Sequence, residues 1–221
     1  MAAFEEKLHQ GQPVYATGEP LEQARAALLM VHGRGASAQD ILSLATEVDQ
    51  EGFAYLAPQA ALGTWYPYSF LEPVERNEPW LSSALSQLHQ ITQHIEQADI
   101  PPERIILVGF SQGACLTLEF AARESRRYGG IAGFSGGLIG AQIDDSRYSG
   151  NLEGTPVFLG CSNVDPHIPE ERVKESAQVL QRLGGEVNMK IYPGMGHTVN
   201  QDELDHLREM MEVISQQTGD S

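Results

Sequence analysis

Two short stretches of the chain carry the pattern Gly-x-Ser-x-Gly, a residue spacing that can place a reactive serine on a sharp turn. They are GFSQGA at residues 109–114 and GFSGG at residues 133–137. In one large group of enzymes this pattern holds a serine between a strand and a helix, where its hydroxyl can attack a carbonyl carbon. At most one of Ser111 and Ser135 can be that nucleophile, and the flanking residues favour one of them.

Ser111 has the flanking sequence that such a turn needs. The run before it, RIILVGF, is rich in β-branched residues, and GACLTLEFAARES after it predicts a helix. Gly109 and Gly113 permit the tight turn, and the helix N-terminus brings free N–H groups and a positive dipole end to the serine. After Ser135 the glycine-rich GGLIGAQIDDS has no helical periodicity and predicts a loop. The sequence therefore favours Ser111 as the nucleophile.

A nucleophilic serine needs a histidine base and a carboxylate that orients it. In strand–turn–helix serine enzymes the chain order is serine, then acid, then histidine. Asp165 and His197 each follow a predicted strand, 54 residues after Ser111 and a further 32 residues on. Open α/β sheets place their sites at this end of the strands. We predict Asp165 as the acid and His197 as the base, and we place His167 in the acid loop, too near Asp165 to bridge it to Ser111.

Carbonyl attack creates an oxyanion, which backbone N–H groups can stabilise. One donor is the residue after the nucleophile, here Gln112, and the other comes from the loop after an earlier strand. The stretch LMVHGRGAS is that strand and loop, and Arg34 between Gly33 and Gly35 is the expected second donor. The loss of one such donor costs about 100- to 1000-fold in rate. His32, at the strand end, is interpreted as a hydrogen-bonded structural residue.

A segment rich in aromatic residues and proline, TWYPYSFLEPVERNEPW, occupies residues 64–80 and holds both tryptophans of the chain. We interpret residues 63–80 as a proline-stiffened flap whose aromatic faces meet an apolar acyl or alcohol group. Trp65, Tyr66, Phe70 and Trp80 are the predicted substrate-binding residues. The alternative is that the same side chains only pack the loop onto the core.

These candidate residues require a framework of alternating strands and helices. Short apolar runs predict strands, and stretches with an apolar residue every three or four positions predict helices. Such an alternation is typical of an α/β fold with a mostly parallel central sheet and helices on both faces. We expect a single domain over residues 1–221, with residues 12–18 as an antiparallel edge strand. The predicted strands are 26–33, 53–59, 104–110, 130–136, 156–161 and 187–193, and the predicted helices are 82–98, 113–125, 169–184 and 201–217.

The amino-acid composition limits the kinds of molecule that the chain is expected to bind. The chain has 14 Lys and Arg against 30 Asp and Glu, a formal net charge of −16. Such an acidic surface repels phosphate backbones and anionic lipids, so we expect neither nucleic-acid binding nor stable membrane association.

No apolar run reaches the roughly 18 residues of a membrane span, and no signal peptide is recognisable, which favours the cytoplasm. Two cysteines suggest neither a disulfide framework nor a metal site. Whether the acidity reflects a saline habitat stays open.

Four of the motifs together resemble one family. MVHGRG, PPERIILVGFSQGA, VDPHIP and YPGMGH are similar to the oxyanion loop, nucleophile turn, acid loop and base loop of the phospholipase/carboxylesterase branch of the α/β-hydrolases, which includes the acyl-protein thioesterases. The resemblance covers about residues 27–204 and implies the α/β-hydrolase fold with the roles assigned above. The chain departs from the thioesterase pattern at Arg34, usually hydrophobic, at Ala36, usually aspartate, and at GCSN, which replaces a His-Gly pair.

The expected protein is thus a serine carboxylesterase that cleaves small-molecule esters of short- to medium-chain acids through an acyl-enzyme. It needs no cofactor and no metal. An acyl thioesterase or a lysophospholipase is the alternative reaction. A non-catalytic small-molecule-binding relative with the same fold is the alternative of another class. The sequence leaves the oligomeric state open, a homodimer included.

Overall fold

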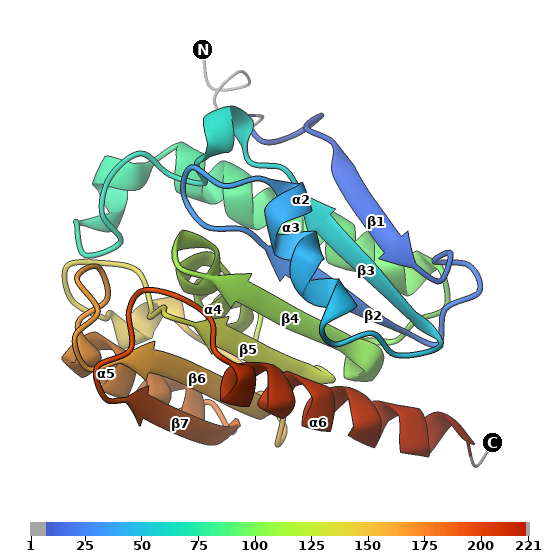
Figure 1. Cartoon of the computed structure of the whole chain (residues 1–221). Coiled ribbons are helices and arrows are strands. Elements are labelled where there is room, and N and C mark those ends of the chain that lie inside the picture. The colour runs from blue at the N-terminus through green and yellow to red at the C-terminus, as the bar shows by residue number, and fades with distance from the viewer. Residues whose placement is uncertain (1–7, 220–221) are drawn as a thin grey trace.

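The computed structural model describes residues 8–219, with side chains to residue 216. A seven-stranded sheet forms its centre, in the order β1-β3-β2-β4-β5-β6-β7 (Figure 1). The first seven residues, which include most of the stretch that suggested the lack of a signal peptide, lie outside the described part. The strands are β1 (Val14–Gly18), β2 (Ala26–Val31), β3 (Phe53–Pro58), β4 (Ile105–Phe110), β5 (Gly130–Phe134), β6 (Pro156–Ser162) and β7 (Glu186–Tyr192).

The sheet has the predicted mostly parallel arrangement. Strands β2 to β7 all run in the same direction, whereas the edge strand β1 pairs with β3 in the antiparallel direction. The central strands are buried along nearly their whole length, β2 completely so. A parallel sheet covered on both faces gives such unbroken apolar runs, because both sides of every strand meet other side chains. The predicted edge strand is confirmed, shortened to five residues.

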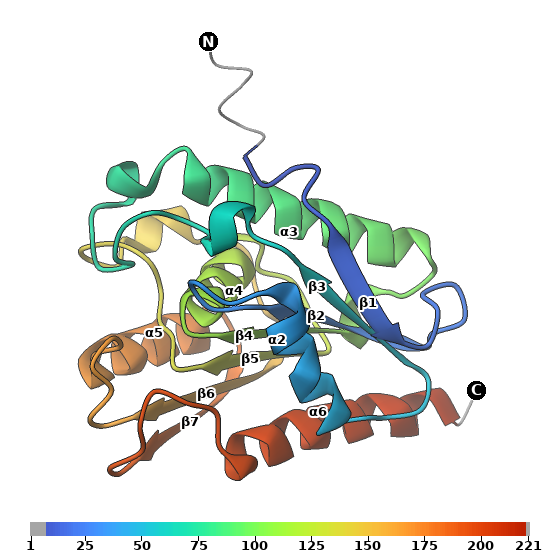
Figure 2. The ribbon, with the colours of Figure 1, turned by 45° about the horizontal axis from the view of Figure 1, so that its top comes forward.

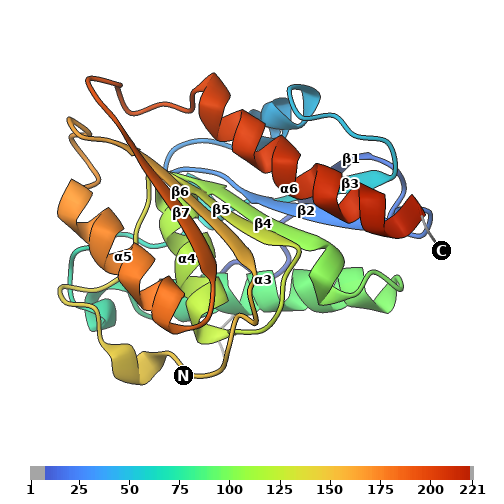
Figure 3. The ribbon, with the colours of Figure 1, turned by 90° about the horizontal axis from the view of Figure 1, so that it is seen from below.

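Helices cover both faces of the sheet (Figures 2 and 3). One apolar core lies between the sheet and α3, α4 and α5, and a second lies between the opposite face and α2 and α6. None of these helices, within residues 8–219, is long and apolar enough to cross a bilayer. The sequence prediction missed the short α2, whose N-cap Ser37 accepts the N–H of Asp40. The helices are α2 (Ala38–Leu42), α3 (Trp80–Gln97), α4 (Gln112–Arg123), α5 (Glu170–Arg182) and α6 (Gln201–Gly219).

The order of the strands explains where a site can form. After β2 the chain moves outward to β3, whereas after β4 it moves in the opposite direction to β5. The loops after β2 and β4 therefore diverge above adjacent strands and leave a crevice at the carboxyl ends, where open α/β sheets bind their ligands. The loops after β6 and β7 reach the same edge. This edge gathers Arg34, Ser111, Asp165 and His197.

Candidate active site

Ser111 occupies a strained turn between β4 and α4. Its backbone has φ 57° and ψ −122°, which a residue with a side chain rarely adopts, and its N–H donates to the carbonyl of Phe134 over 2.9 Å. The flanking glycines are required because a Cβ on Gly109 would lie 2.4 Å from the Gly113 carbonyl oxygen, and one on Gly113 would lie 2.1 Å from that of Val31. Strain of this kind persists only where the surrounding structure holds it, and it gathers at functional sites.

The structure brings the three predicted residues into one hydrogen-bonded chain. The Nε2 atom of His197 lies 2.8 Å from Ser111 Oγ, and its Nδ1 atom lies 2.7 Å from Asp165 Oδ2. The Asp165 side chain is fully buried, whereas that of His197 is 20% exposed. The base can therefore be reached from solvent, and the acid cannot.

Asp165 is held as a carboxylate by its surroundings. Burial alone would raise its pKa, but the hydrogen bond with His197 and the backbone N–H groups of His167 and Ile168 outweigh that effect and lower it. These two N–H groups donate to Oδ1 over 2.8 and 3.1 Å, which leaves Oδ2 for the imidazole. A fixed negative charge beside Nδ1 keeps the proton on that nitrogen and the lone pair of Nε2 directed at the serine.

The base loop and the acid loop are tied to each other. The Ser162 hydroxyl donates to the carbonyl of Met195, and the N–H of Gly194 donates to Asn163 Oδ1 over 2.9 Å. The imidazole itself is flanked by the rings of Phe110 and His167, each with its centroid 4.9 Å from that of His197. These contacts fix the position of the ring between serine and carboxylate. His167 thus lies in the loop that the sequence predicted, beside the base.

The expected oxyanion donors lie around the same serine. Gln112 is the first residue of α4, and Arg34 follows Gly33, where an added Cβ would lie 3.3 Å from Ser111 Cβ. Neither the N–H of Arg34 nor that of Gln112 has a hydrogen-bond acceptor within residues 8–219. Backbone donors without a partner beside a helix N-terminus are suited to a developing negative charge.

A cavity of about 460 Å³ opens beside the serine and the imidazole. Two of the four predicted substrate-binding residues, Tyr66 and Phe70, line it, together with Arg34, Gln112, Ile168 and the loop between the two aromatic residues. Trp65 and Trp80 do not line it. The expectation that Trp65 contacts the substrate is therefore corrected, because Trp65 is fully buried and the structure shows the alternative of packing. The same expectation for Trp80, which is partly exposed, stays a prediction.

Trp65 is a core residue because its polar and apolar contacts are both internal. It is fully buried, its indole N–H donates to the carbonyl of His32 over 2.8 Å, and its ring lies between the rings of His9 and His32. His9 also accepts the N–H of Ala61 and contacts Trp80 edge-on. Sequence reasoning did not find this role of His9, because no motif or periodicity marks it. Burial lowers the pKa of both histidines and keeps them neutral.

Two side chains hold the flap in place, and sequence reasoning found neither role. The Gln112 amide accepts the N–H of Trp65 over 3.0 Å and donates to the carbonyl of Tyr66 over 2.8 Å. The Arg34 guanidinium donates to the carbonyls of Pro67 and Tyr68 over 2.8 and 2.7 Å. The only signal for Arg34 was its departure from the thioesterase pattern. Both expected oxyanion residues thus also anchor the cavity wall.

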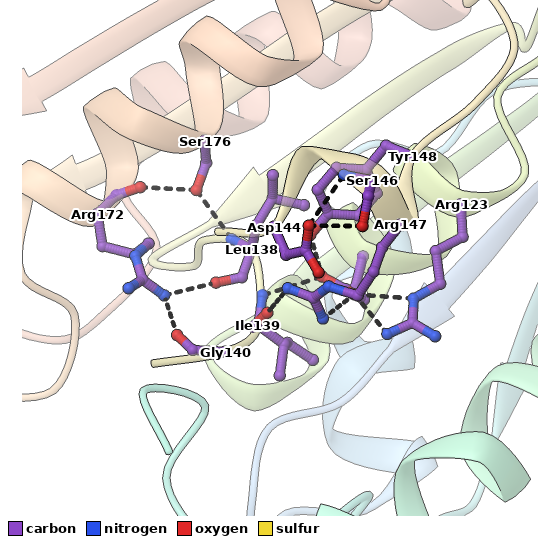
Figure 4. Close-up of polar contacts among 11 residues, drawn as sticks. Arg123, Leu138, Ile139, Gly140, Asp144, Ser146, Arg147, Tyr148, Arg172 and Ser176 are labelled. Atoms are coloured by element: carbon purple, nitrogen blue, oxygen red, sulfur yellow. Dashed lines mark hydrogen bonds and ion pairs between the residues drawn. The ribbon is translucent and has the colours of Figure 1, made fainter. Parts of the chain in front are cut away.

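The loop after β5 contacts that wall, and Figure 4 shows how Arg172 and Ser176 bond to this loop. The N–H of Gly140 donates to the Phe70 carbonyl over 2.7 Å. Arg172 donates to the carbonyls of Leu138 and Gly140, and the buried carboxylate of Glu119 accepts the N–H of Ile139. Arg172 thus ties this loop to α5 and Glu119 ties it to α4, and the loss of either contact would leave a buried charge without its partner. The remaining partners of Glu119 are Arg123, Arg147 and Tyr148.

The other nucleophile candidates lie outside the hydrogen-bonded chain. Ser135 is fully buried at the end of β5, and its hydroxyl has no partner in the described part of the chain. Burial raises the pKa of the Cys115 and Cys161 thiols to about 12, so both stay protonated and unreactive near neutral pH. Among residues 8–219, no group of three or more His, Cys, Asp or Glu could hold a metal ion.

The fold and these residues define an α/β-hydrolase with a serine at the turn between β4 and α4. The chain belongs to the phospholipase/carboxylesterase family, whose model matches residues 13–215. The crystal structure of a phospholipase/carboxylesterase from Dyadobacter fermentans is 42% identical, with a TM-score of 0.89, and the match covers 91% of this chain and 97% of that one.

Relatives named as thioesterases and relatives named as carboxylesterases match this chain over comparable lengths. Acyl-protein thioesterase 1 of Gibberella zeae is 32% identical over 212 residues, which is 86% of this chain and 90% of the relative. A probable carboxylesterase SOBER1-like of Arabidopsis thaliana is 25% identical over 217 residues, 90% of this chain and 82% of the relative. These matches establish the family of the chain. They do not decide between an esterase and a thioesterase, because relatives of both names match.

Proposed function

We propose that this protein is a serine carboxylesterase that hydrolyses esters through an acyl-enzyme. The observation that supports it most directly is the hydrogen-bonded chain from Ser111 through His197 to the buried Asp165. In the proposed reaction the Ser111 hydroxyl attacks the ester carbonyl while His197 Nε2 takes its proton. The N–H groups of Arg34 and Gln112 stabilise the oxyanion. We also propose that residues 1–221 form a single domain.

The two halves of the reaction use the same imidazole. When the tetrahedral intermediate collapses, the bond between the acyl carbon and the alcohol oxygen breaks, and His197 returns its proton to that oxygen. Water then enters, gives a proton to His197 and attacks the acyl-enzyme, and the acid leaves as Ser111 regains its hydrogen. Asp165 stays ionised throughout and stabilises the imidazolium of each half-reaction.

A short- to medium-chain acyl group suits the cavity. Tyr66 and Phe70 line its wall, and hydrogen bonds from Arg34 and Gln112 hold the loop that carries these two residues. A thioesterase is the second candidate, supported by relatives such as acyl-protein thioesterase 1 of Gibberella zeae.

A rate series on nitrophenyl esters of increasing acyl length, with a palmitoyl thioester measured alongside, tests the proposal. We expect kcat/KM to peak at short or medium acyl chains and to be low for the palmitoyl thioester. A preference for the palmitoyl thioester would instead favour the thioesterase. Stoichiometric labelling of Ser111 by a fluorophosphonate separates both from a non-catalytic relative, in which no labelling is expected.

A further inference from the structure

A second hollow shares His197 with the cavity described above. It is a groove of about 320 Å³ between α2, the loop after β2 and the loop before α6. We call it the α2 groove. The residues that line it and carry the argument are Gly33, Ile41, Leu44, Phe110, His197 and Val199.

His197 lines both hollows, whereas the serine and the two expected oxyanion residues line only the first cavity. Ser111, Gln112 and Arg34 line the first cavity and not the α2 groove, whereas His197 borders both. The partition between them is thin, because Gly33 lies so near the serine that an added Cβ would be 3.3 Å from Ser111 Cβ. A substrate bonded to Ser111 can therefore extend to both sides of the imidazole.

The chemistry assigns each arm of an ester to one side. In the tetrahedral intermediate the oxyanion points to the N–H groups of Arg34 and Gln112, which line the first cavity. The alcohol oxygen must face His197 Nε2, because that atom returns the proton as the carbon–oxygen bond breaks. We propose that the acyl arm occupies the first cavity and that the α2 groove binds the apolar group of the leaving alcohol. This inference rests on the proposed esterase function and specifies its substrate.

The walls of the α2 groove indicate a neutral alkyl or aryl alcohol. Ile41, Leu44, Phe110 and Val199 provide apolar surface, and no Lys or Arg within the described chain lines the groove. Its rim carries Asp40, a carboxylate held by hydrogen bonds from Ser37. A negative charge at the rim and a net charge of −16 on the chain both repel an anionic leaving group such as a phosphorylated thiol. An apolar alcohol meets no such barrier.

The test varies the alcohol and the acid separately. Acetate esters of methanol, butanol and hexanol form one series, and methyl esters of acetic, butyric and hexanoic acid form the other. In the wild type we expect kcat/KM to rise with alcohol length by about fourfold per methylene that becomes buried. Leu44→Ala should flatten the alcohol series and leave the acyl series unchanged. Ala36 also lines the groove, so Ala36→Leu, which fills part of it, should lower kcat/KM for hexyl acetate more than for methyl acetate.

A matched variant probes the first cavity. Tyr68 lines that cavity and is 47% exposed, so Tyr68→Ala should change the acyl series and spare the alcohol series. A second readout is acyl transfer: with nitrophenyl acetate as donor, hexanol should capture the acyl-enzyme better than methanol. This advantage should shrink in Leu44→Ala, because an acceptor alcohol enters where the leaving alcohol departs.

Three results would overturn the inference. The first is an alcohol series that is flat in the wild type, and the second is one that neither Leu44→Ala nor Ala36→Leu alters although acetate esters are cleaved. The third is a groove variant that changes the acyl series instead, which would place the acyl arm in the α2 groove. If no ester is cleaved and a fluorophosphonate leaves Ser111 unlabelled, the proposed function itself fails, and this inference fails with it.

Discussion

The turns at Ser111 and Ser135 share almost every local feature. Each serine ends a strand, follows Gly-Phe and has a positive φ, 57° and 53° respectively. Each also donates its N–H to the next strand of the sheet, Ser111 to the carbonyl of Phe134 and Ser135 to that of Gly160. Yet the Ser111 hydroxyl reaches a histidine in an open cavity, and the Ser135 hydroxyl is fully buried without a partner in the described chain.

The difference between these turns arises from what the chain does next. After Ser111 it enters α4, so the serine stands at a helix N-terminus at the carboxyl edge of the sheet. After Ser135 it continues as a loop that Arg172 and Glu119 hold against the flap. The same strained backbone thus supports a candidate nucleophile in one place and a wall of its cavity in the other. The turn alone does not make a nucleophile, since it also needs a base within reach and space for a substrate.

Exchange of each serine for alanine should separate the turns by the largest effect. Ser111→Ala should lower kcat by a factor on the order of 10⁴ to 10⁶ and abolish fluorophosphonate labelling, because the attacking oxygen is lost. Ser135→Ala removes a buried hydroxyl without a partner and should keep both activity and labelling. Labelling that persists in Ser111→Ala, or disappears in Ser135→Ala, would reverse the assignment of the two turns.

The second prediction concerns the base that only Ser111 reaches. Asp165→Asn should lower kcat by about 10⁴-fold, because the amide cannot hold the imidazole with its proton on Nδ1. The carboxamide keeps the size of the side chain, so thermal unfolding should show a folded protein. His167→Ala is the control, since His167 touches the imidazole only at its edge, and it should retain most of the activity. Full activity in Asp165→Asn would mean that the carboxylate does not orient the base.

The sequence was sufficient for the framework and for the order of the three polar residues. All six predicted parallel strands are confirmed within one to two residues at each end, because parallel strands with both faces covered are continuous apolar runs between turn residues. The sequence also placed Ser111 before a helix, and Asp165 and His197 each after a strand. Their proximity then follows from the parallel sheet, whose carboxyl ends meet at one edge.

The flap could not be predicted in the same way. Its conformation depends on side chains that bond to backbone atoms far along the chain, such as Gln112 to residues 65 and 66, or Arg34 to residues 67 and 68. Contacts of this kind leave no periodicity in the sequence. A tryptophan in a proline-rich loop is equally consistent with a substrate face and with a core, and the burial of Trp65 beside His9 decides between them.

A third prediction tests how tightly each turn is packed. Gly109 and Gly133 precede the two serines by the same two residues. A Cβ on Gly109 would lie 2.4 Å from a backbone carbonyl oxygen, whereas one on Gly133 would lie 3.0 Å from the end of the Leu118 side chain. Gly109→Ala should therefore lower the free energy of unfolding by about 3 kcal/mol or more, and Gly133→Ala by about 1 kcal/mol, since only a side chain can move aside. Equal losses in urea unfolding would contradict this difference.

A fourth prediction concerns the region behind the Ser135 turn, at Glu203 in the first turn of α6. Its carboxylate accepts the N–H of Asn200 over 2.9 Å, but its other oxygen is buried without a partner in the described chain. That oxygen faces Gly160, whose carbonyl receives the N–H of Ser135 and where an added Cβ would lie 2.1 Å from it. Burial raises the pKa of Glu203 from about 4.5 to about 7, although the bond from Asn200 acts in the opposite direction.

This shift predicts a pH dependence of stability that activity does not share. Folded Glu203 keeps its proton up to about pH 7, whereas the unfolded chain releases it near 4.5. The free energy of the unfolded state therefore falls relative to that of the native state as the pH rises between these values, and the fold loses stability. Glu203→Gln keeps an acceptor for Asn200 and removes the titration, so from about pH 5 to about pH 8 the wild type should lose at most about 3 kcal/mol relative to the variant. Urea midpoints of both proteins across that range measure the difference, and the buried histidines cancel because both proteins contain them.

A wild type that gains stability relative to the variant as the pH rises would show that Glu203 is ionised in the fold. A variant whose kcat falls with its stability unchanged would connect Glu203 to the Ser111 side instead.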